Sequence, residues 1–176
     1  MKNKRANAMT GSLILSLQRH QQVFAGLFAN VSRDQINWRS ERGKWNMLEA
    51  VCHLLDEERE DFRARVKSIL DDPTQPLPPI DPEGWVITRK YAEQDFDITV
   101  TGFLNERETS VAWLKSLKDP QWDNTYQHPK LGPMSARLFL TNWVAHDLLH
   151  IRQITRMHYQ YLAANTDISL DYAGKW

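Results

Sequence analysis

Apolar residues recur at helical spacing along four long stretches of this chain, and this pattern limits what the chain can fold into. The stretches run from about residue 10 to 30, 46 to 70, 95 to 117 and 135 to 162. Asn46 and Glu49 form the sequence pattern of a capping box at the start of the second stretch, and Asp71-Asp72-Pro73 ends it. Strand signals are nearly absent, since no segment alternates convincingly and no Asn-Gly or Asp-Gly turn occurs. We therefore predict an all-α four-helix bundle, with long connections between helices 2 and 3 and between helices 3 and 4.

Length and composition are those of a globular protein. We predict one domain over residues 1–176, with a bundle core at about 11–162 and a C-terminal tail at 163–176. Lys+Arg and Asp+Glu balance at 22 each, which argues against nucleic acid as a partner. No apolar run reaches the roughly 18 residues that a membrane-spanning helix needs. The one cysteine, Cys52, excludes an intrachain disulfide, and we expect a cytoplasmic location.

Two histidines in the last predicted helix are the first candidate site. His146 and His150 are four residues apart, so a helix stacks both imidazoles on one face. At 100° per residue this face also carries Phe139, Trp143 and Met157, so both rings point toward the apolar interior. Two neutral imidazoles in this arrangement can share a divalent metal ion. A hydrogen-bonded pair of core histidines fits the same pattern.

A third histidine, His53, is harder to interpret from its position. Its neighbours around the second predicted helix include Glu49, Asp56 and Glu57, whereas the apolar stripe lies on the far side. Periodicity alone favours a solvated acidic face for His53. The alternative is that this face lines a polar cavity, in which Glu57 could be a further ligand.

Other polar residues favour structural interpretations. Asp147 could orient a ligand imidazole, although a salt bridge to a neighbouring helix or subunit is favoured. His20 is predicted at the surface, and Cys52 is predicted to be a buried thiol. The charge run from residue 56 to 61 is predicted to end as solvated helix surface.

Two segments resemble the signature regions of the DinB/YfiT-like superfamily. The first runs from Gly43-Lys-Trp45 to His53-Leu-Leu-Asp56-Glu57, and the second is His146-Asp-Leu-Leu-His150-Ile-Arg-Gln153. The resemblance covers roughly residues 11–162. It implies a four-helix bundle that binds one divalent ion through three histidines at the mouth of a cavity. Matched position by position, these ligands are His53, His146 and His150.

The resemblance also implies a metal-dependent enzyme that acts on a small molecule. Characterised members are similar to thiol S-transferases or isomerases, and others are described as metal-dependent hydrolases. Our first hypothesis is transfer of a metal-activated thiolate to a small electrophile, with a low-molecular-weight thiol as cosubstrate. The alternatives are hydrolysis by a metal-bound water, with Glu57 or Asp56 as the base, and a non-catalytic metal or small-molecule binding protein associated with stress.

The metal and the oligomeric state are less constrained. Imidazole ligands favour zinc or nickel, with manganese or iron as further candidates. The resemblance to related helical bundles implies that this protein forms a homodimer. The tryptophan-rich loops and the apolar flank Leu140, Val144, Leu148 and Ile151 are the candidate interfaces.

Overall fold

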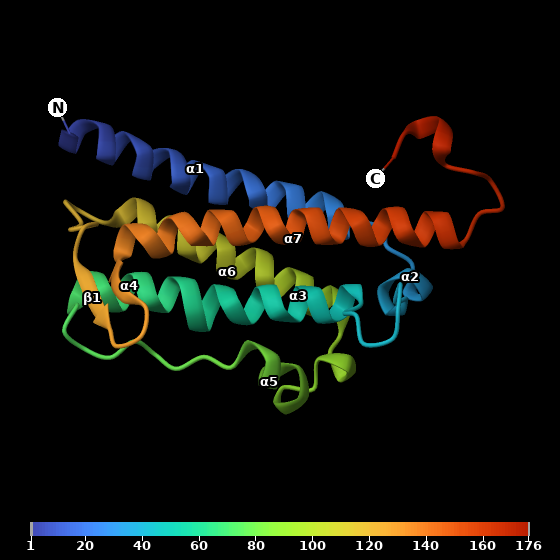
Figure 1. Ribbon diagram of the computed structural model, residues 1–176, viewed down its shortest axis with the longest axis horizontal. Helices are drawn as coiled ribbons and strands as arrows, with labels where there is room; N and C mark the ends of the chain where they lie inside the picture. The colour runs from blue at the N-terminus through green and yellow to red at the C-terminus, as the bar shows by residue number, and fades with distance from the viewer. Residues whose placement is uncertain (1, 176) are drawn as a thin grey trace.

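The computed structural model describes the backbone of residues 2–175 and the side chains of residues 9–175. Four long helical rods pack side by side, which confirms the predicted bundle (Figure 1). The second rod is a continuous run in which one π-helical turn separates two α-helices. In chain order the rods are α1 (Lys2–Phe28), α3–η1–α4 (Met47–Asp56, Glu57–Phe62 and Arg63–Asp71), α6 (Phe96–Ser116) and α7 (Ala136–Ala164).

Shorter elements occupy the connections and the tail. The first rod begins at Lys2 rather than near residue 10, so the predicted start of that helix is wrong. The remaining elements are α2 (Arg33–Asn37), α5 (Pro82–Thr88), the 3-10 turns η2 (Tyr91–Glu93) and η3 (Asp171–Ala173), and the strands β1 (Thr125–His128) and β2 (Gly132–Ser135).

The order of the rods around the bundle differs from their order in the chain. Figure 1 shows α1 and α7 running in one direction, and α3–α4 and α6 running in the opposite direction. The first rod packs on α6 and α7, and the second rod packs on the same two helices. The first two rods therefore lie diagonally opposite each other. Because α4 and α6 run the same way, residues 72–95 must return along the whole bundle. No helix in the described part of the chain is long and apolar enough to cross a membrane.

Side-chain caps begin the long helices where the sequence indicates. The Asn46 side chain accepts a hydrogen bond from the Glu49 amide, and the Glu49 carboxylate accepts one from the Asn46 amide. Asp95 and Ser135 cap α6 and α7 with their side chains, each of which accepts one hydrogen bond from the amide three residues further on. Each cap satisfies an amide that the first helical turn leaves unpaired. The predicted capping box is thus confirmed, and it fixes the start of the helix that carries His53.

The connection between α6 and α7 contains a small hairpin that was not expected. Strands β1 and β2 pair antiparallel, with His128 opposite Gly132. Gly132 has a φ of +76°, a conformation that glycine adopts without strain. Strands of four residues are too short to show an alternating pattern, which is why the sequence did not indicate them.

Two apolar clusters fill the bundle, one toward each end. One contains Leu17, Phe62 and Trp143, and the other contains Phe24, Leu54 and Phe103. Leu140 and Val144 belong to the first cluster. Half of the apolar flank named as a candidate dimer interface therefore lies in the core. Of its four residues, Leu148 is the one that is clearly exposed.

Candidate metal centre

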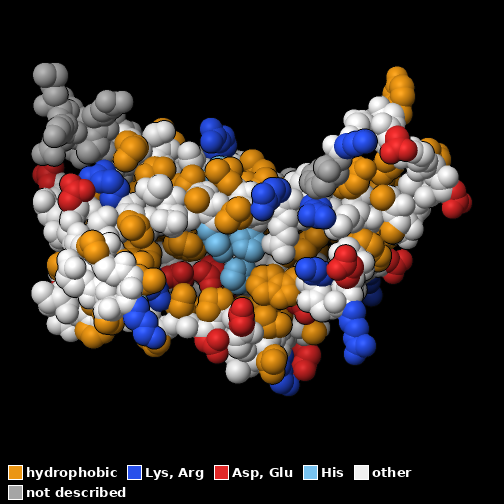
Figure 2. Space-filling model, in the orientation of Figure 1, with side chains coloured by type: hydrophobic (Ala, Val, Ile, Leu, Met, Phe, Trp, Pro, Cys, Tyr) orange, Lys and Arg blue, Asp and Glu red, His pale blue; other side chains and the backbone are white. Residues whose placement is uncertain are grey.

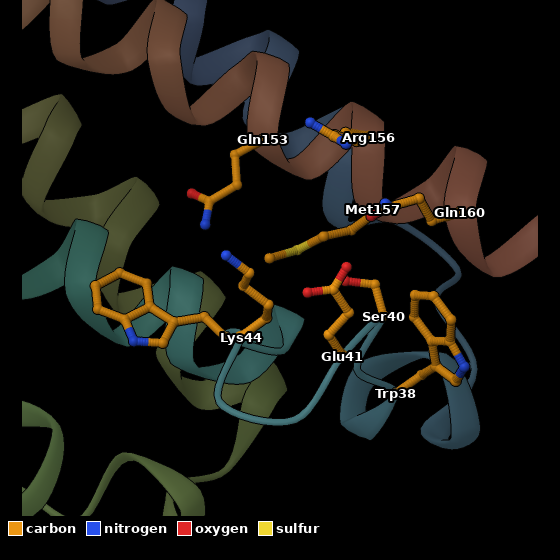
Figure 3. A pocket seen from close by; sticks show the side chains of 9 residues that line it. Trp38, Ser40, Glu41, Lys44, Gln153, Arg156, Met157 and Gln160 are labelled. Carbon is orange, nitrogen blue, oxygen red and sulfur yellow. The ribbon is translucent and has the colours of Figure 1, made fainter. Parts of the chain in front are cut away.

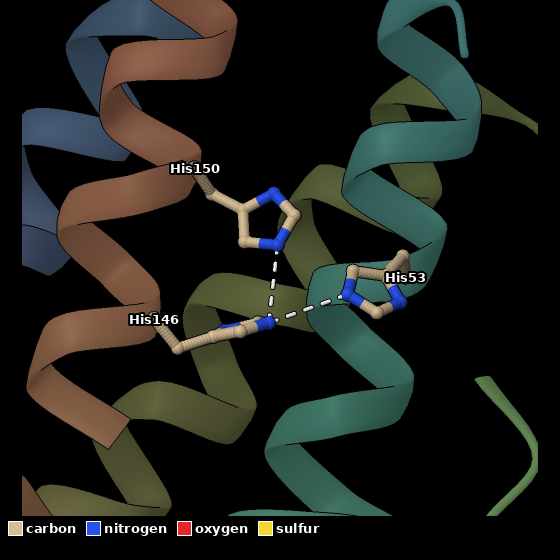
Figure 4. A group of neighbouring side chains, drawn as sticks. All are labelled: His53, His146 and His150. Atoms are coloured by element: carbon tan, nitrogen blue, oxygen red, sulfur yellow. Dashed lines mark hydrogen bonds between the residues drawn. The ribbon is translucent and has the colours of Figure 1, made fainter. Parts of the chain in front are cut away.

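Three imidazole rings converge between α3 and α7. The Nε2 atom of His146 lies 3.3 Å from Nε2 of His53 and 3.0 Å from Nε2 of His150. The nearest nitrogens of all three rings lie within 4.8 Å of one another. Figure 4 shows the rings of His146 and His150 on one helix and the ring of His53 on the facing helix, all turned toward one point. The three histidines that the resemblance singled out are thus brought together.

Local helical geometry explains the positions of His146 and His150, and packing between helices explains that of His53. His146 and His150 occupy the inward face of α7 that the helical angles predict. His53 is only 7 % exposed, so the solvated face favoured by periodicity is wrong. The face of α3 that carries His53 is turned toward α7, and there it lines a polar site.

The contacts among the rings suit a cation better than a proton. A neutral imidazole nitrogen has either one proton or one lone pair, so Nε2 of His146 cannot satisfy two facing nitrogens. Two nitrogens bound to one ion at about 2.0–2.1 Å are separated by roughly 2.9–3.4 Å for right-angle to tetrahedral geometry. The separations of His146 from His53 and from His150 fall in this range, and all three nitrogens lie within 4.8 Å of one another, so the residues present fit one divalent ion.

The environment keeps the rings in the form that binds metals. Burial and then the neighbouring His150 lower the pKa of His53 to about 3. Burial, His150 and His53 lower the pKa of His146 to about 3. Burial also lowers the pKa of His150, although Gln153 and Asp147 oppose this shift. The imidazoles are therefore neutral at neutral pH, with lone pairs available as ligands.

Aromatic rings surround the histidines, and one side remains open to solvent. The ring of Trp45 lies 4.8 Å from the ring of His53, and the ring of Phe62 lies 5.0 Å from that of His146. His146 and His150 are partly exposed. Figure 2 shows histidine side chains gathered in one patch midway along the visible face, beside hydrophobic and acidic side chains. A small molecule can thus reach the centre from this face.

A pair of buried carboxyl groups lies on the π-helical turn that follows His53. Burial and then Asp61 raise the pKa of Glu57 to about 8. Burial also raises the pKa of Asp61, but its ion pair with Arg65 works in the opposite direction. Glu57 is therefore the member of this pair that holds its proton more readily, and Arg65 favours the charged form of Asp61. Because Asp61 is buried, the predicted solvated end of the charge run is wrong at this position.

The π-helical turn explains why the helical angles failed here. An α-helix of 3.6 residues per turn is locally widened between Glu57 and Phe62, which changes the direction of the residues that follow. Glu57, Glu58 and Asp61 are all buried as a result. Turns of this kind occur frequently at functional sites.

Asp147 belongs to a buried ionic network beside the histidines. Its two oxygens accept hydrogen bonds of 2.6 and 2.7 Å from Arg107 on α6, and His20 on α1 lies 3.0 Å away. The favoured interpretation of Asp147, a salt bridge to a neighbouring helix, agrees with these contacts. His20 is only 3 % exposed, so its predicted surface position is wrong. A polar residue that bonds across 127 positions leaves no local signal in the sequence.

Sequence reasoning missed the other half of this network. Arg107 donates three hydrogen bonds of 2.8 to 3.0 Å to Glu58, and the Trp143 indole donates one to the same carboxylate. Burial disfavours the charge of Arg107, yet Glu58 and Asp147 together hold its pKa above the usual value. Arg107 lies four residues from Phe103 and from Val111, both of which are core residues, and this inward helical position was the available signal.

The fold and the site together are those of a helical-bundle protein with a mostly buried centre of three histidines. Comparison with known proteins identifies its family. The model of the DinB superfamily matches residues 16–154, so the chain belongs to this superfamily. Among solved structures it is similar to YfiT from Bacillus subtilis, with a TM-score of 0.76 and 20 % sequence identity over 86 % of this chain and 87 % of that chain. YfiT is described as a probable metal-dependent hydrolase with an unusual four-helix bundle topology. No curated protein matches the sequence.

Proposed function

We propose that this protein is a divalent-metal-dependent enzyme that transfers a small thiol to an electrophilic small molecule. The observation that carries the proposal is the convergence of three neutral imidazoles, from His53, His146 and His150, on one partly exposed point. No carboxylate joins this cluster among the described residues. The donor set is therefore uncharged and leaves an ion its full double charge.

An ion in this position would supply Lewis acidity, which lowers the pKa of a coordinated thiol or water. The protein itself supplies the rest of the site. The three histidines hold the centre on two rigid helices, and Trp45 and Phe62 exclude bulk water from two of its sides. The thiol sulfur attacks the electrophilic carbon, a carbon–sulfur bond forms, and the leaving group departs with its bonding electrons. The thiol proton passes to solvent.

The state of Glu57 favours a thiol over water as the nucleophile. Hydrolysis assisted by a protein base needs a side chain that accepts a proton from water, and Glu57 is one of the two residues, with Asp56, that we predicted for this role. With a pKa raised to about 8, Glu57 already carries a proton at neutral pH. A thiol starts with a far lower pKa than water, so it depends less on such a base. Hydrolysis stays as the second candidate because YfiT, a similar structure, is described as a probable hydrolase.

A turnover assay distinguishes these functions. The protein is loaded with one equivalent of zinc or nickel and supplied with an aryl halide or an epoxide, with and without cysteine as the thiol. We expect turnover that requires both metal and thiol, and we expect Glu57→Gln to retain it within about threefold. Turnover of esters or amides without thiol, lost by roughly a hundredfold in Glu57→Gln, would establish hydrolysis instead.

The control is His128→Ala, which removes a histidine on the hairpin, outside the three-histidine cluster. This variant should bind metal and turn over like the unmodified protein. A metal-loaded protein that is inactive toward every thiol and electrophile, while its histidines retain the ion, would contradict the enzymatic proposal and leave a metal-binding protein.

A further inference from the structure

A cavity opens directly beside the histidine centre, between the loop at residues 38–45 and α7. Its volume is about 280 Å³. Trp45, whose ring packs on His53, forms part of its wall, and so does Gln153, one turn beyond His150 on α7. Figure 3 shows Lys44 and Glu41 reaching from the loop toward α7, and Gln153 and Met157 reaching toward them from the helix. The cavity and the centre thus share two walls.

The loop that carries Lys44 is held in place by contacts at both ends. Arg39 pairs with Glu49 on α3 at 2.8 Å and also donates a hydrogen bond to the carbonyl oxygen of Lys44. The ring of Trp38 packs edge-on against Tyr161 of α7 at 5.7 Å. Gly43, with a φ of +83°, makes the turn before Lys44. The cavity wall is therefore preformed.

The cavity has two positive charges without a partner. Lys44 and Arg156 both line it, and neither forms an ion pair with any side chain that the structure describes. Most other arginines of the bundle pair with carboxylates, as Arg39, Arg63 and Arg107 do. Glu41 adds a single negative charge to the same cavity and likewise lies beyond salt-bridge distance of both cations. The net charge of the lining is positive.

We propose that this cavity binds the carboxylate of an amino-acid-like or short-peptide-like substrate, with Lys44 and Arg156 as the recognition groups. This inference rests on the proposed function, because it places the carboxylate beside the centre at which the same molecule's thiol would react. Arg156 offers a fork of donors that matches a carboxylate, and Lys44 offers a point charge.

The size and the charges of the cavity narrow the ligand class. A volume of about 280 Å³ is at the lower end for small-molecule sites, which suits a ligand no larger than a dipeptide. Glu41 accommodates an ammonium group and disfavours a doubly charged phosphate. An α-amino carboxylate meets both conditions, and the tryptophan walls can cover its apolar part.

Matched dipeptides test the proposal by binding rather than by turnover. The probes are cysteinylglycine and cysteinylglycinamide, which differ in one carboxylate, and the S-methylated form of each. Quenching of tryptophan fluorescence and titration calorimetry report the affinity for zinc-loaded protein. We expect each acid to bind roughly threefold to tenfold more tightly than its amide. Lys44→Gln and Arg156→Gln should each remove most of this preference, and Glu41→Gln should weaken binding of each acid and of its amide to a similar extent, because both carry the ammonium group.

The matched control is Arg152→Gln, which removes the same charge from an exposed position one turn earlier on α7, outside the cavity. This variant should keep the preference for the acid. Equal affinities for acid and amide in the unmodified protein, or a loss in Arg152→Gln equal to that in Arg156→Gln, would overturn the proposal. If the S-methylated acid is preferred and no thiol is turned over, the carboxylate site stands and the proposed thiol transfer fails.

Discussion

At the scale of single residues, the centre depends on where each imidazole directs its Nε2 atom. The Nε2 atom of His146 lies against Nε2 of both other rings, and burial lowers the pKa of all three. Neutral nitrogens without other partners are costly to bury, so a bound cation resolves an arrangement that is otherwise unfavourable. The bound ion itself stays a prediction.

Removal of the ligands should remove the metal. We expect His146→Ala/His150→Ala to abolish stoichiometric retention of zinc or nickel, because one imidazole cannot hold the ion alone. His53→Ala should weaken retention to a comparable extent. Elemental analysis of protein purified without a polyhistidine tag measures the stoichiometry, and circular dichroism checks that the helices remain. Full occupancy in His53→Ala would mean that this ring is not a ligand.

The raised pKa of Glu57 predicts a pH dependence of stability. A carboxyl group whose pKa rises from 4.5 to about 8 on folding holds its proton after the unfolded chain has released it. Its contribution to stability is therefore complete below pH 4.5 and is lost as the pH rises through 8. We expect Glu57→Gln to gain stability relative to the unmodified, metal-free protein over this window. Urea unfolding at pH 5 and pH 8 measures the difference, and a difference that does not change with pH would contradict it.

At the scale of helices, the main feature is a layer of buried charge between two apolar clusters. Each long rod contributes one buried charged or polar residue to this layer. Along the chain, that residue lies between residues of one apolar cluster and residues of the other. These members are His20, Glu58, Arg107 and Asp147. Arg107 contacts both carboxylates, and His20 contacts Asp147, so the layer joins all four rods. Asp147 adjoins His146 in the chain, so the network also supports the helical turn that carries two of the metal-binding candidates.

Removal of the central cation should be costly. Arg107→Met leaves Glu58 and Asp147 buried without their counter-charge, and the loss of one partner from a buried ionic group costs about 3–5 kcal/mol. We expect the free energy of unfolding in urea to fall by this amount. Arg152→Met removes an exposed arginine from α7 and should change it by less than about 0.5 kcal/mol. Equal effects of the two variants would show that the network is not required for stability.

At the scale of the whole molecule, the centre links two rods that meet only through tertiary packing. His53 lies on α3, and His146 and His150 lie on α7. An ion that binds the folded bundle and not the unfolded chain stabilises it by mass action. Half of the apolar flank named as a candidate dimer interface lies in the core, and the homodimer itself stays a prediction that sedimentation equilibrium can measure.

Metal should therefore raise the melting temperature. Free zinc at a thousandfold excess over its dissociation constant contributes about 4 kcal/mol, which corresponds to roughly 10 °C for a chain of this size. Differential scanning calorimetry with zinc and with a chelator measures the shift. His53→Ala should lose most of the zinc-dependent shift, whereas His128→Ala should keep it. A shift that survives in His53→Ala would place the ion elsewhere.

Local sequence patterns were enough to predict part of this structure. The period of 3.6 residues located the four rods, the Asn46 capping box located the start of the second rod, and the i, i+4 spacing placed His146 and His150 on one inward face. These features depend on residues within one or two helical turns of each other, so the local sequence is enough to predict them.

The remaining features depend on contacts between distant segments. His53 meets His146 across 93 positions, and its burial followed from how α3 packs against α7 rather than from its own neighbours. Glu58 and Asp61 face inward at the π-helical turn, where Arg107 on α6 and Arg65 on the same rod are their partners. No local period encodes such pairings, since their free energy arises only when the helices have packed and water has left the space between them.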